Sequence, residues 1–348
     1  MRNFRVNERP NESWVINELI KRFGLSTNSK ELESIDITTS MSDLDDGCVL
    51  NIKKGTKVVL SSDYIRGREF KLFRLGLLDY FDIGFYLVAA NLSDLAAMGA
   101  WPVGINLILR YPPDINKSQI IELINGIATA CEHFGSCNLL GGDTGGATDL
   151  VLSATAVGIT PNPLLRSFAR IGDKIYIIGN PGVAGAALAL ALNGFLTDET
   201  FPKDIKNQLL RPWRRPKVFL HEGLTIAKIG NPIACQDTSD GLKTTLTQIA
   251  KSSNVSIVID ELLLNPDEIL KLSAKKLNRD VLDLYLGASV DFGLVISAPQ
   301  NIDIEEKLRI FPETSVNFIG KVINGEPKVY LKRTNGDLTS IPGVEYIQ

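Results

Sequence analysis

The ten residues NLSDLAAMGA, at positions 91–100, close a long apolar stretch and carry a carboxylate inside it. Apolar residues run from about position 78 to position 98, which predicts one long helix ended by Gly99. The apolar segment 103–109 then predicts a strand. A carboxylate buried in such a helix is costly unless it is paired or bound to a metal. Asp94 is therefore predicted to have a ligand.

Four other segments place aspartate after an apolar strand or beside a glycine turn. Taken singly, each is explained by a helix cap or a turn. If several of these carboxylates converge, their mutual repulsion requires divalent cations, and oxygen ligands suit magnesium. Magnesium commonly bridges carboxylates to substrate phosphates, so a polyphosphate ligand is expected. The four segments are Asp45-Asp46-Gly47, Ser61-Ser62-Asp63, Gly141-Gly142-Asp143-Thr144 and Asp237-Thr238-Ser239-Asp240-Gly241.

The chain has 348 residues, more than one hydrophobic core normally serves, so two domains are expected. Residues 161–170 contain two prolines and interrupt the alternation of apolar segments, which predicts a linker there. The predicted domains are residues 1–160 and 171–348, both mixed α and β. Two local predictions concern the N-terminal half: segments 48–52 and 57–61 form a hairpin, and residues 141–146 form a glycine-rich loop.

Composition and charge exclude several classes of function. The net charge of −3, without a basic cluster, argues against nucleic acid as a partner. The longest apolar stretch, 184–192, is about half of the roughly 20 residues that a membrane-spanning helix needs. Residues 1–10 lack the apolar core of a secretory signal, so a cytoplasmic location is expected. The four cysteines are widely spaced and are expected to be reduced, buried thiols.

The common phosphate-binding loops are poorly represented. No G-x-x-x-x-G-K-[ST] sequence occurs. Residues 179–185 follow a predicted strand and open a helix, but their spacing is G-x-x-G-x-x-G and no suitably placed acid follows, so we interpret them as a tight turn. The chain has two histidines, His133 and His221, both in predicted helices, which disfavours histidine triads and zinc sites.

In their order and approximate spacing, the five aspartate segments resemble those of the thiamine-monophosphate kinase family, within the superfamily of aminoimidazole-ribonucleotide synthetase. The similarity covers about residues 43–320, and NLSDLAAMGA is similar to the family's signature helix. It implies a homodimer whose N-terminal sheets form a barrel, with ATP and magnesium ions between the two domains. The implied reaction is in-line transfer of the γ-phosphoryl group from ATP to thiamine monophosphate, giving thiamine diphosphate and ADP, with thiamine monophosphate as the small-molecule partner.

The resemblance also assigns roles to particular residues. No catalytic group is implied beyond those that position metal and ATP. The implied ligands of magnesium are Asp45, Asp46, Ser61, Ser62, Asp63, Asp94, Asp143, Asp237 and Asp240. The implied contacts to ATP are Ser239, Arg166, Gly141 and Gly142, and the candidate contacts to the acceptor are Glu69 and Asp291.

This chain departs from the family pattern at positions where the family carries polar groups. Glu69 stands near a usual histidine and Tyr86 at a common lysine. Gly145 and Gly146 replace Thr-Arg, and Val183 and Ala184 replace Asp-Ser. Residues 286–294 are similar to the family's S-G-G-E-D-Y-E-L segment, but Val290 and Gly293 replace its two glutamates. The metal and triphosphate positions are thus retained, whereas the acceptor pocket is altered.

Three hypotheses stay open on the sequence. The first is a thiamine-monophosphate kinase with a divergent acceptor pocket. The second is a related ATP-dependent enzyme acting on another small acceptor, and the third is a paralogue that binds ATP without turnover. Selenophosphate synthetases are disfavoured because no Cys or Lys motif precedes Asp45, and hydrogenase-maturation relatives because the sequence ends in VEYIQ without a cysteine.

Overall fold

The computed structural model describes residues 9–23, 33–39, 49–135, 137–198, 201–230 and 232–344, and the chain divides into two compact units. Both units are mixed α and β, as predicted. Unit 1 consists of Met1–Leu95, Trp101–Thr160 and Trp213–Arg215. Unit 2 consists of Ala96–Ala100, Pro161–Pro212 and Pro216–Gln348.

Unit 1 is built on a four-stranded sheet with the order β3-β6-β4-β5. Strands β4 and β5 are parallel, whereas β6 runs antiparallel to both β3 and β4. A separate two-stranded sheet pairs β1 with β2. The elements are α1 (Glu12–Phe23), β1 (Ile35–Thr39), β2 (Val49–Ile52), β3 (Lys57–Ile65), η3 (Gly67–Glu69), α2 (Lys71–Arg74), α3 (Tyr80–Ala97), β4 (Trp101–Tyr111), α4 (Lys117–His133), β5 (Asn138–Gly146) and β6 (Val151–Thr160).

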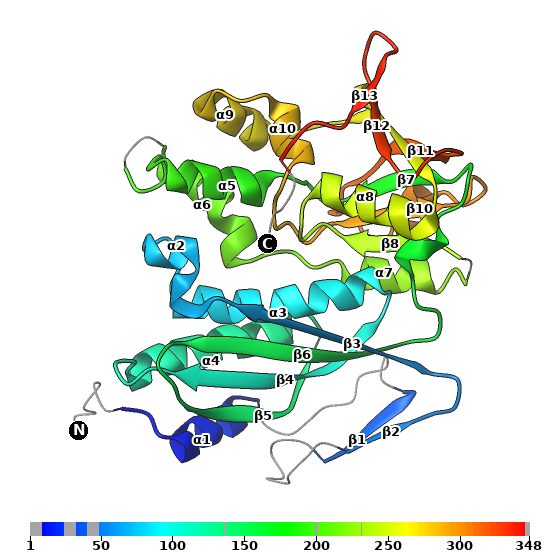
Figure 1. Ribbon diagram of the computed structural model, residues 1–348. Helices are drawn as coiled ribbons and strands as arrows, with labels where there is room; N and C mark the ends of the chain where they lie inside the picture. The colour runs from blue at the N-terminus through cyan, green and yellow to red at the C-terminus, as the bar shows by residue number, and fades with distance from the viewer. Residues whose placement is uncertain are drawn as a thin grey trace. The chain divides into compact units, whose positions relative to one another are not determined.

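Helix α3 covers one face of this sheet (Figure 1). Its Leu95 side chain contacts Gly158 of β6, and α3 packs tightly on α4 because Gly84 and Gly126 each face the backbone of the other helix. The α3 side chains are almost all buried, which explains why its sequence is apolar all round rather than on one stripe. The opposite face of the sheet exposes a set of apolar side chains: Val58, Leu60, Tyr64, Ile108 and Val151.

Unit 2 is built on a seven-stranded sheet with the order β13-β12-β9-β11-β7-β10-β8. Its elements are η4 (Arg166–Phe168), β7 (Lys174–Ile178), α5 (Val183–Leu192), α6 (Lys203–Arg214), α7 (Leu220–Ala227), β8 (Ala234–Asp237), α8 (Leu242–Ser253), β9 (Ser256–Asp260), η5 (Glu261–Leu263), α9 (Glu268–Leu277), α10 (Val281–Leu286), β10 (Leu294–Ala298), α11 (Ile304–Leu308), β11 (Val316–Ile323), β12 (Val329–Lys332) and β13 (Leu338–Ser340).

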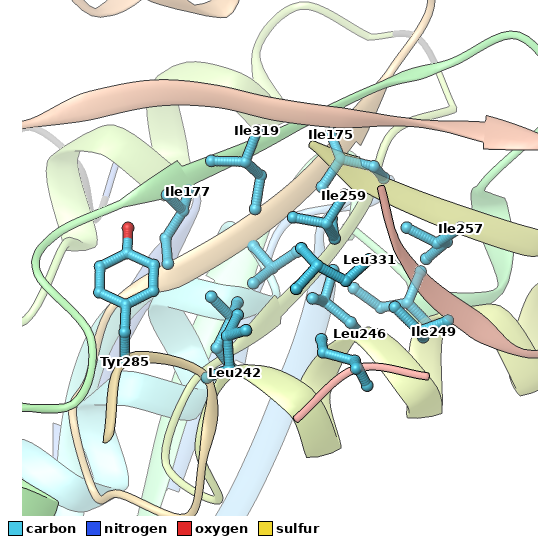
Figure 2. Packing of buried hydrophobic residues seen from close by; sticks show 14 of the residues in the cluster. Ile175, Ile177, Leu242, Leu246, Ile249, Ile257, Ile259, Tyr285, Ile319 and Leu331 are labelled. Atoms are coloured by element: carbon cyan, nitrogen blue, oxygen red, sulfur yellow. The ribbon is translucent and has the colours of Figure 1, made fainter. Parts of the chain in front are cut away.

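The core of unit 2 lies between this sheet and α8. Leu242, Leu246 and Ile249 of α8 are fully buried and belong to the same cluster as Ile175 and Ile259 of the sheet. Figure 2 shows these side chains packed together. The three α8 residues follow the spacing of one helical face, so burial of that face fixes how α8 lies on the sheet.

Two local predictions were wrong. Strands β2 and β3 exist on either side of a turn at Gly55, but β2 pairs with β1 while β3 pairs with β6 over nine residues, so they form no hairpin. Residues 141–146 are not a loop, because they continue β5 and pair with β4 as far as Gly146. In both cases a strand distant in sequence determines the pairing of the segment, and local turn signals do not reveal that partner.

No helix among the described residues is long and apolar enough to cross a membrane. The three described cysteines, Cys131, Cys137 and Cys235, are buried and free, as the sequence predicted. Cys48 lies outside the described residues.

Candidate metal and nucleotide site

The edge of unit 1 formed by β3 and α3 brings several predicted ligands together. The Ser61 hydroxyl donates a hydrogen bond to Oδ2 of Asp94. The backbone N–H of Asp63 donates to Oδ1 of Asn91 at 3.0 Å, and the Asn91 amide donates to the Leu87 carbonyl at 2.9 Å. Asn91 and Asp94 are three residues apart and so lie on the same side of α3. Ser61, Asp63 and Asp94 thus form one oxygen-rich group.

Asn91 was not predicted as a site residue, although it opens the signature stretch. Its side chain is fully buried, and its Oδ1 accepts from the backbone N–H of Asp63, which ties α3 to β3. A buried asparagine in an apolar helix is itself a signal, because its amide needs hydrogen-bond partners. Here those partners link α3 to β3.

Ser62 and Asp143 do not join this group. Successive strand residues point to opposite faces, and the Ser62 hydroxyl contacts that of Thr155 at 2.8 Å on the face away from α3. Asp143 lies on β5, at the opposite edge of the sheet from β3, and forms an ion pair with Arg110. Three strand spacings separate β3 from β5, which is about 14 Å. Asp45 and Asp46 lie outside the described residues.

The two predicted glycine contacts precede Asp143 on β5. Gly142 has φ +151° and approaches the Leu107 carbonyl so closely that a side chain would collide with it. Gly141 lies against the Asn106 side chain of the neighbouring strand. Both glycines are therefore explained by sheet geometry, and their contact to ATP stays a prediction.

The second aspartate turn lies in unit 2, where β8 ends at Asp237. The Ser239 hydroxyl donates to Oδ1 of Asp237 at 3.0 Å, and the Thr245 hydroxyl donates to the Asp237 carbonyl at 2.8 Å. Asp237 is 5% exposed, and both Ser239 and Asp240 are half-buried. Gly241 has φ +88° and begins α8, packed against the backbone of residues 287–289. Asp237, Ser239 and Asp240 thus form a second oxygen-rich group.

Arg166 of η4 lies in unit 2 and is held by α8. Its Nη1 donates to Oε1 of Gln248 at 3.3 Å, and its backbone carbonyl accepts from the Ser253 hydroxyl at 2.9 Å. The Arg166 residue itself is exposed. Neither Gln248 nor Ser253 was predicted as a site residue, because the contacts join residues more than 80 positions apart.

Glu69 and Asp291, the two candidate contacts to the acceptor substrate, lie outside both oxygen-rich groups. Glu69 is exposed and pairs with Arg74 at 2.7 Å. Asp291 is buried, and its two carboxylate oxygens accept from the backbone N–H groups of Gly182 at 2.6 Å and Ala184 at 3.1 Å. Burial raises the pKa of Asp291, with hydrogen bonds from Ser289 and the backbone opposing that rise.

The position of Asp291 also explains the G-x-x-G-x-x-G turn. A helix N-terminus is a ready anion site, and in dinucleotide-binding loops a pyrophosphate occupies it. At the N-terminus of α5 the Asp291 carboxylate already takes the donors of Gly182 and Ala184. This occupation agrees with the interpretation of the segment as a turn.

The chemistry of the two oxygen-rich groups fits magnesium. No cluster of three or more His, Cys, Asp or Glu side chains that could enclose a metal occurs within the described parts of the chain. Magnesium does not need such a cage, because it usually keeps several waters and binds one or two carboxylates plus substrate phosphates. The carboxylate and hydroxyl oxygens beside Asp94 and Asp237 are ligands of that kind.

A cavity of about 500 Å³ lies elsewhere in unit 1. It is lined by the start of α1, the end of β4 and the end of β5, including Glu12, Tyr111 and Gly146. None of the predicted metal or ATP residues lines it. The candidate site is therefore defined by its oxygen ligands and not by this cavity.

Comparison with known proteins places these motifs in a family. Residues 44–160 match the model described as AIR synthase related protein, N-terminal domain, and residues 170–332 match AIR synthase related protein, C-terminal domain. Thiamine-monophosphate kinase of Pyrococcus abyssi (strain GE5 / Orsay) is 30% identical over 256 residues, 72% of this chain and 74% of the relative.

Two solved structures show the same fold. The crystal structure of thiamine-monophosphate kinase from Stenotrophomonas maltophilia K279a has a TM-score of 0.77 at 26% identity, and the match covers 96% of this chain and 100% of that one. AaThiL complexed with AMPPCP and TMP has a TM-score of 0.71 at 22% identity, covering 100% and 99%.

The fold and both domain matches make the chain one of the AIR synthase related proteins. The aspartate motifs that suggested the resemblance all lie within these matches. The chain belongs to the thiamine-monophosphate kinase family.

Proposed function

We propose that this protein transfers the γ-phosphoryl group of ATP directly to thiamine monophosphate, giving thiamine diphosphate and ADP. Family membership supports the reaction, and its named relatives are thiamine-monophosphate kinases. The observation that carries the proposal is that β3 contacts α3 through its predicted ligands: Ser61 donates a hydrogen bond to Asp94, and the backbone N–H of Asp63 donates to Asn91. This group supplies hard oxygen ligands at the motif that defines the family.

The chemistry requires little from the protein beyond positioning. A phosphate monoester has a second pKa near 6 and is mostly ionised at neutral pH, so the acceptor needs no general base. Bound magnesium would supply charge neutralisation on the triphosphate. The aspartates would hold it, and Arg166 would add a cation for the phosphate oxygens. Catalysis then rests on alignment and electrostatic stabilisation.

We further propose that both units contribute to one nucleotide site. Asp63 and Asp94 of unit 1 and Asp237 and Asp240 of unit 2 would be the metal ligands, with Ser239 and Arg166 on ATP. Support comes from the two separate oxygen-rich groups, each of which supplies too few oxygen ligands to hold several magnesium ions alone. Asp45 and Asp46 stay predicted ligands outside the described residues.

The working form is proposed to be a homodimer in which the four-stranded sheets form a barrel. The face of this sheet away from α3 exposes Leu60 at 68% and Tyr64 at 58%, an apolar surface that a second copy would bury. A second copy would also explain why Asp143 is far from Asp94 within one chain, because β5 of the second copy could then approach β3 of the first. Leu60→Asp should shift the protein toward monomer in light scattering, and an unchanged mass would count against this interface.

The acceptor side supports a second candidate function, an ATP-dependent enzyme of the same superfamily with another small acceptor. In the segment 286–294, Asp291 is committed to α5 and Val290 offers no hydrogen bond. A thiamine-specific pocket would then need polar contacts from elsewhere. A paralogue that binds ATP without turnover is the remaining alternative.

A coupled assay separates these possibilities. ADP release with magnesium and ATP should rise on adding thiamine monophosphate, and it should rise less with other small phosphorylated acceptors. A larger response to another acceptor would favour the second function. No response to any acceptor, despite magnesium-dependent ATP binding, would favour the silent paralogue. The cytoplasmic location stays a prediction.

A further inference from the structure

Helix α8 holds Arg166 at two points. Gln248 accepts from the guanidinium Nη1 at 3.3 Å, and Ser253 donates to the Arg166 backbone carbonyl at 2.9 Å. The same Ser253 oxygen accepts from the backbone N–H of Ala169 at 3.1 Å, which closes the short η4 turn onto the helix. Both the backbone and the side chain of Arg166 therefore depend on α8.

Gln248 is itself oriented by a second amide. The Nε2 of Gln236 donates to the same Oε1 that accepts from Arg166. Gln236 is 6% exposed and immediately precedes Asp237. The Oε1 of its side-chain amide has no hydrogen-bond partner within the described residues. The two amides thus connect Arg166 to the strand that ends in the aspartate turn, and both donors fix the Gln248 oxygen toward Arg166.

The other end of α8 is tied to the same turn. Thr245, three residues before Gln248 and on the same helical face, donates to the carbonyls of Asp237 at 2.8 Å and Gly241 at 3.1 Å. Leu246 and Ile249, each one residue further along the helix, bury the adjacent side of α8 in the core of unit 2 (Figure 2). Helix α8 is consequently a rigid connection between the aspartate turn and Arg166, about 9 Å from Leu242 to Gln248 along its axis.

From this arrangement we infer that Gln248 is a positioning residue, which holds the Arg166 guanidinium at a set distance from Asp237 so that both meet the same nucleotide. The inference rests on the proposed function for the role of Arg166 in binding phosphate. An arginine side chain has many rotamers, and fixing it before the ligand arrives reduces the entropy lost on binding. Loss of the Gln248 carbonyl should therefore weaken nucleotide binding without disturbing the fold.

Three variants of the full chain test this inference by calorimetric titration with magnesium and ATP. Gln248→Leu has a similar size but no acceptor, and it should weaken ATP binding about tenfold, the range expected for losing one hydrogen bond to a charged group. Gln248→Glu keeps an acceptor for both donors and should bind within about threefold of the parent. Gln208→Leu, the same change at an exposed position of α6, is the control.

A merely structural role would act differently. Without nucleotide, Gln248→Leu should melt a few degrees below Gln208→Leu, because the buried Gln236 amide loses its acceptor. In the folded variant the KM for thiamine monophosphate should stay constant while the KM for ATP rises. Equal ATP affinity in the two leucine variants would overturn the inference, as would a glutamate variant as weak as the leucine one. If Gln248→Leu does not fold, Gln248→Asn, which withdraws the carbonyl by one methylene, should show the same loss.

The same titrations distinguish this inference from the proposed function. A parent protein that binds magnesium and ATP but phosphorylates no thiamine monophosphate would contradict the proposed reaction, while the ratio between the leucine and glutamate variants would still decide the role of Gln248. A parent protein that shows no magnesium-dependent ATP binding would overturn both.

Discussion

Replacing Asp291 by alanine should lower the stability of unit 2 and leave the KM for thiamine monophosphate nearly unchanged. The Asp291 carboxylate is buried and accepts from the N–H groups of Gly182 and Ala184 at the first turn of α5. Alanine would remove the carboxylate partner of both buried donors, at about 1–3 kcal/mol each before water or small movements compensate. Relief of the burial penalty that raises the Asp291 pKa offsets part of this loss.

The net loss should be about 3 kcal/mol, which corresponds to a fall in Tm of about 6–12 °C for a domain of this size. Differential scanning calorimetry measures it directly. Asp280→Ala is the matched control, because Asp280 is also a helix cap but is exposed, and its carboxylate accepts from the Leu282 N–H at 2.8 Å. It should cost about 1 kcal/mol.

The opposite pattern would refute this reasoning. If Asp291→Ala melts like the control but raises the KM for thiamine monophosphate tenfold or more, the carboxylate contacts the acceptor, as the sequence resemblance suggested. The capping contacts to α5 would then be replaceable.

Three further outcomes are expected. Asp94→Asn should abolish magnesium-dependent ATP binding in a calorimetric titration while the metal-free Tm stays within a few degrees, because asparagine still accepts from Ser61; a large metal-free loss would mark Asp94 as structural. Burial raises the pKa of Asp82 above its unfolded value, so the stability that this group contributes is present at low pH and is lost as the pH rises through the folded pKa. Melting curves of the parent and Asp82→Asn should therefore diverge between acidic and neutral pH in favour of the variant, and constant separation would contradict this. A hydrogen bond with Cys137, together with burial, raises the pKa of Cys131, and Cys137 is buried as well, so a thiol reagent at pH 8 should label these two only after unfolding; rapid labelling in the folded protein, located by peptide mass mapping, would show that they are accessible.

The sequence predicted those features that depend on local chemistry. The helix containing Asp94 was expected at 78–98 and is found at Tyr80–Ala97, because its apolar length and terminal glycine are local signals. The sequence also predicted that Asp94 needs a ligand, but not that the Ser61 hydroxyl would contact it. The first inference used local signals of a helix, and the second used the cost of burying a charge.

The sequence did not predict features that depend on contacts between residues far apart along the chain. The glycines of residues 141–146 signal a loop locally, yet parallel pairing with β4 makes them a strand. Asp291 follows a family motif, but nothing near it in sequence shows that the α5 N-terminus, about 110 residues earlier, takes its carboxylate. Gln248 gave no signal at all, because a glutamine on a half-polar helix usually faces solvent.

The most direct test of the central claim is single-turnover transfer from γ-labelled ATP at millimolar magnesium, with and without thiamine monophosphate. We expect the label to appear in thiamine diphosphate, and only when the acceptor is present. Magnesium-dependent ATP binding without label in thiamine diphosphate would contradict it, and would assign this nucleotide site to another acceptor or to a protein that binds ATP without turnover.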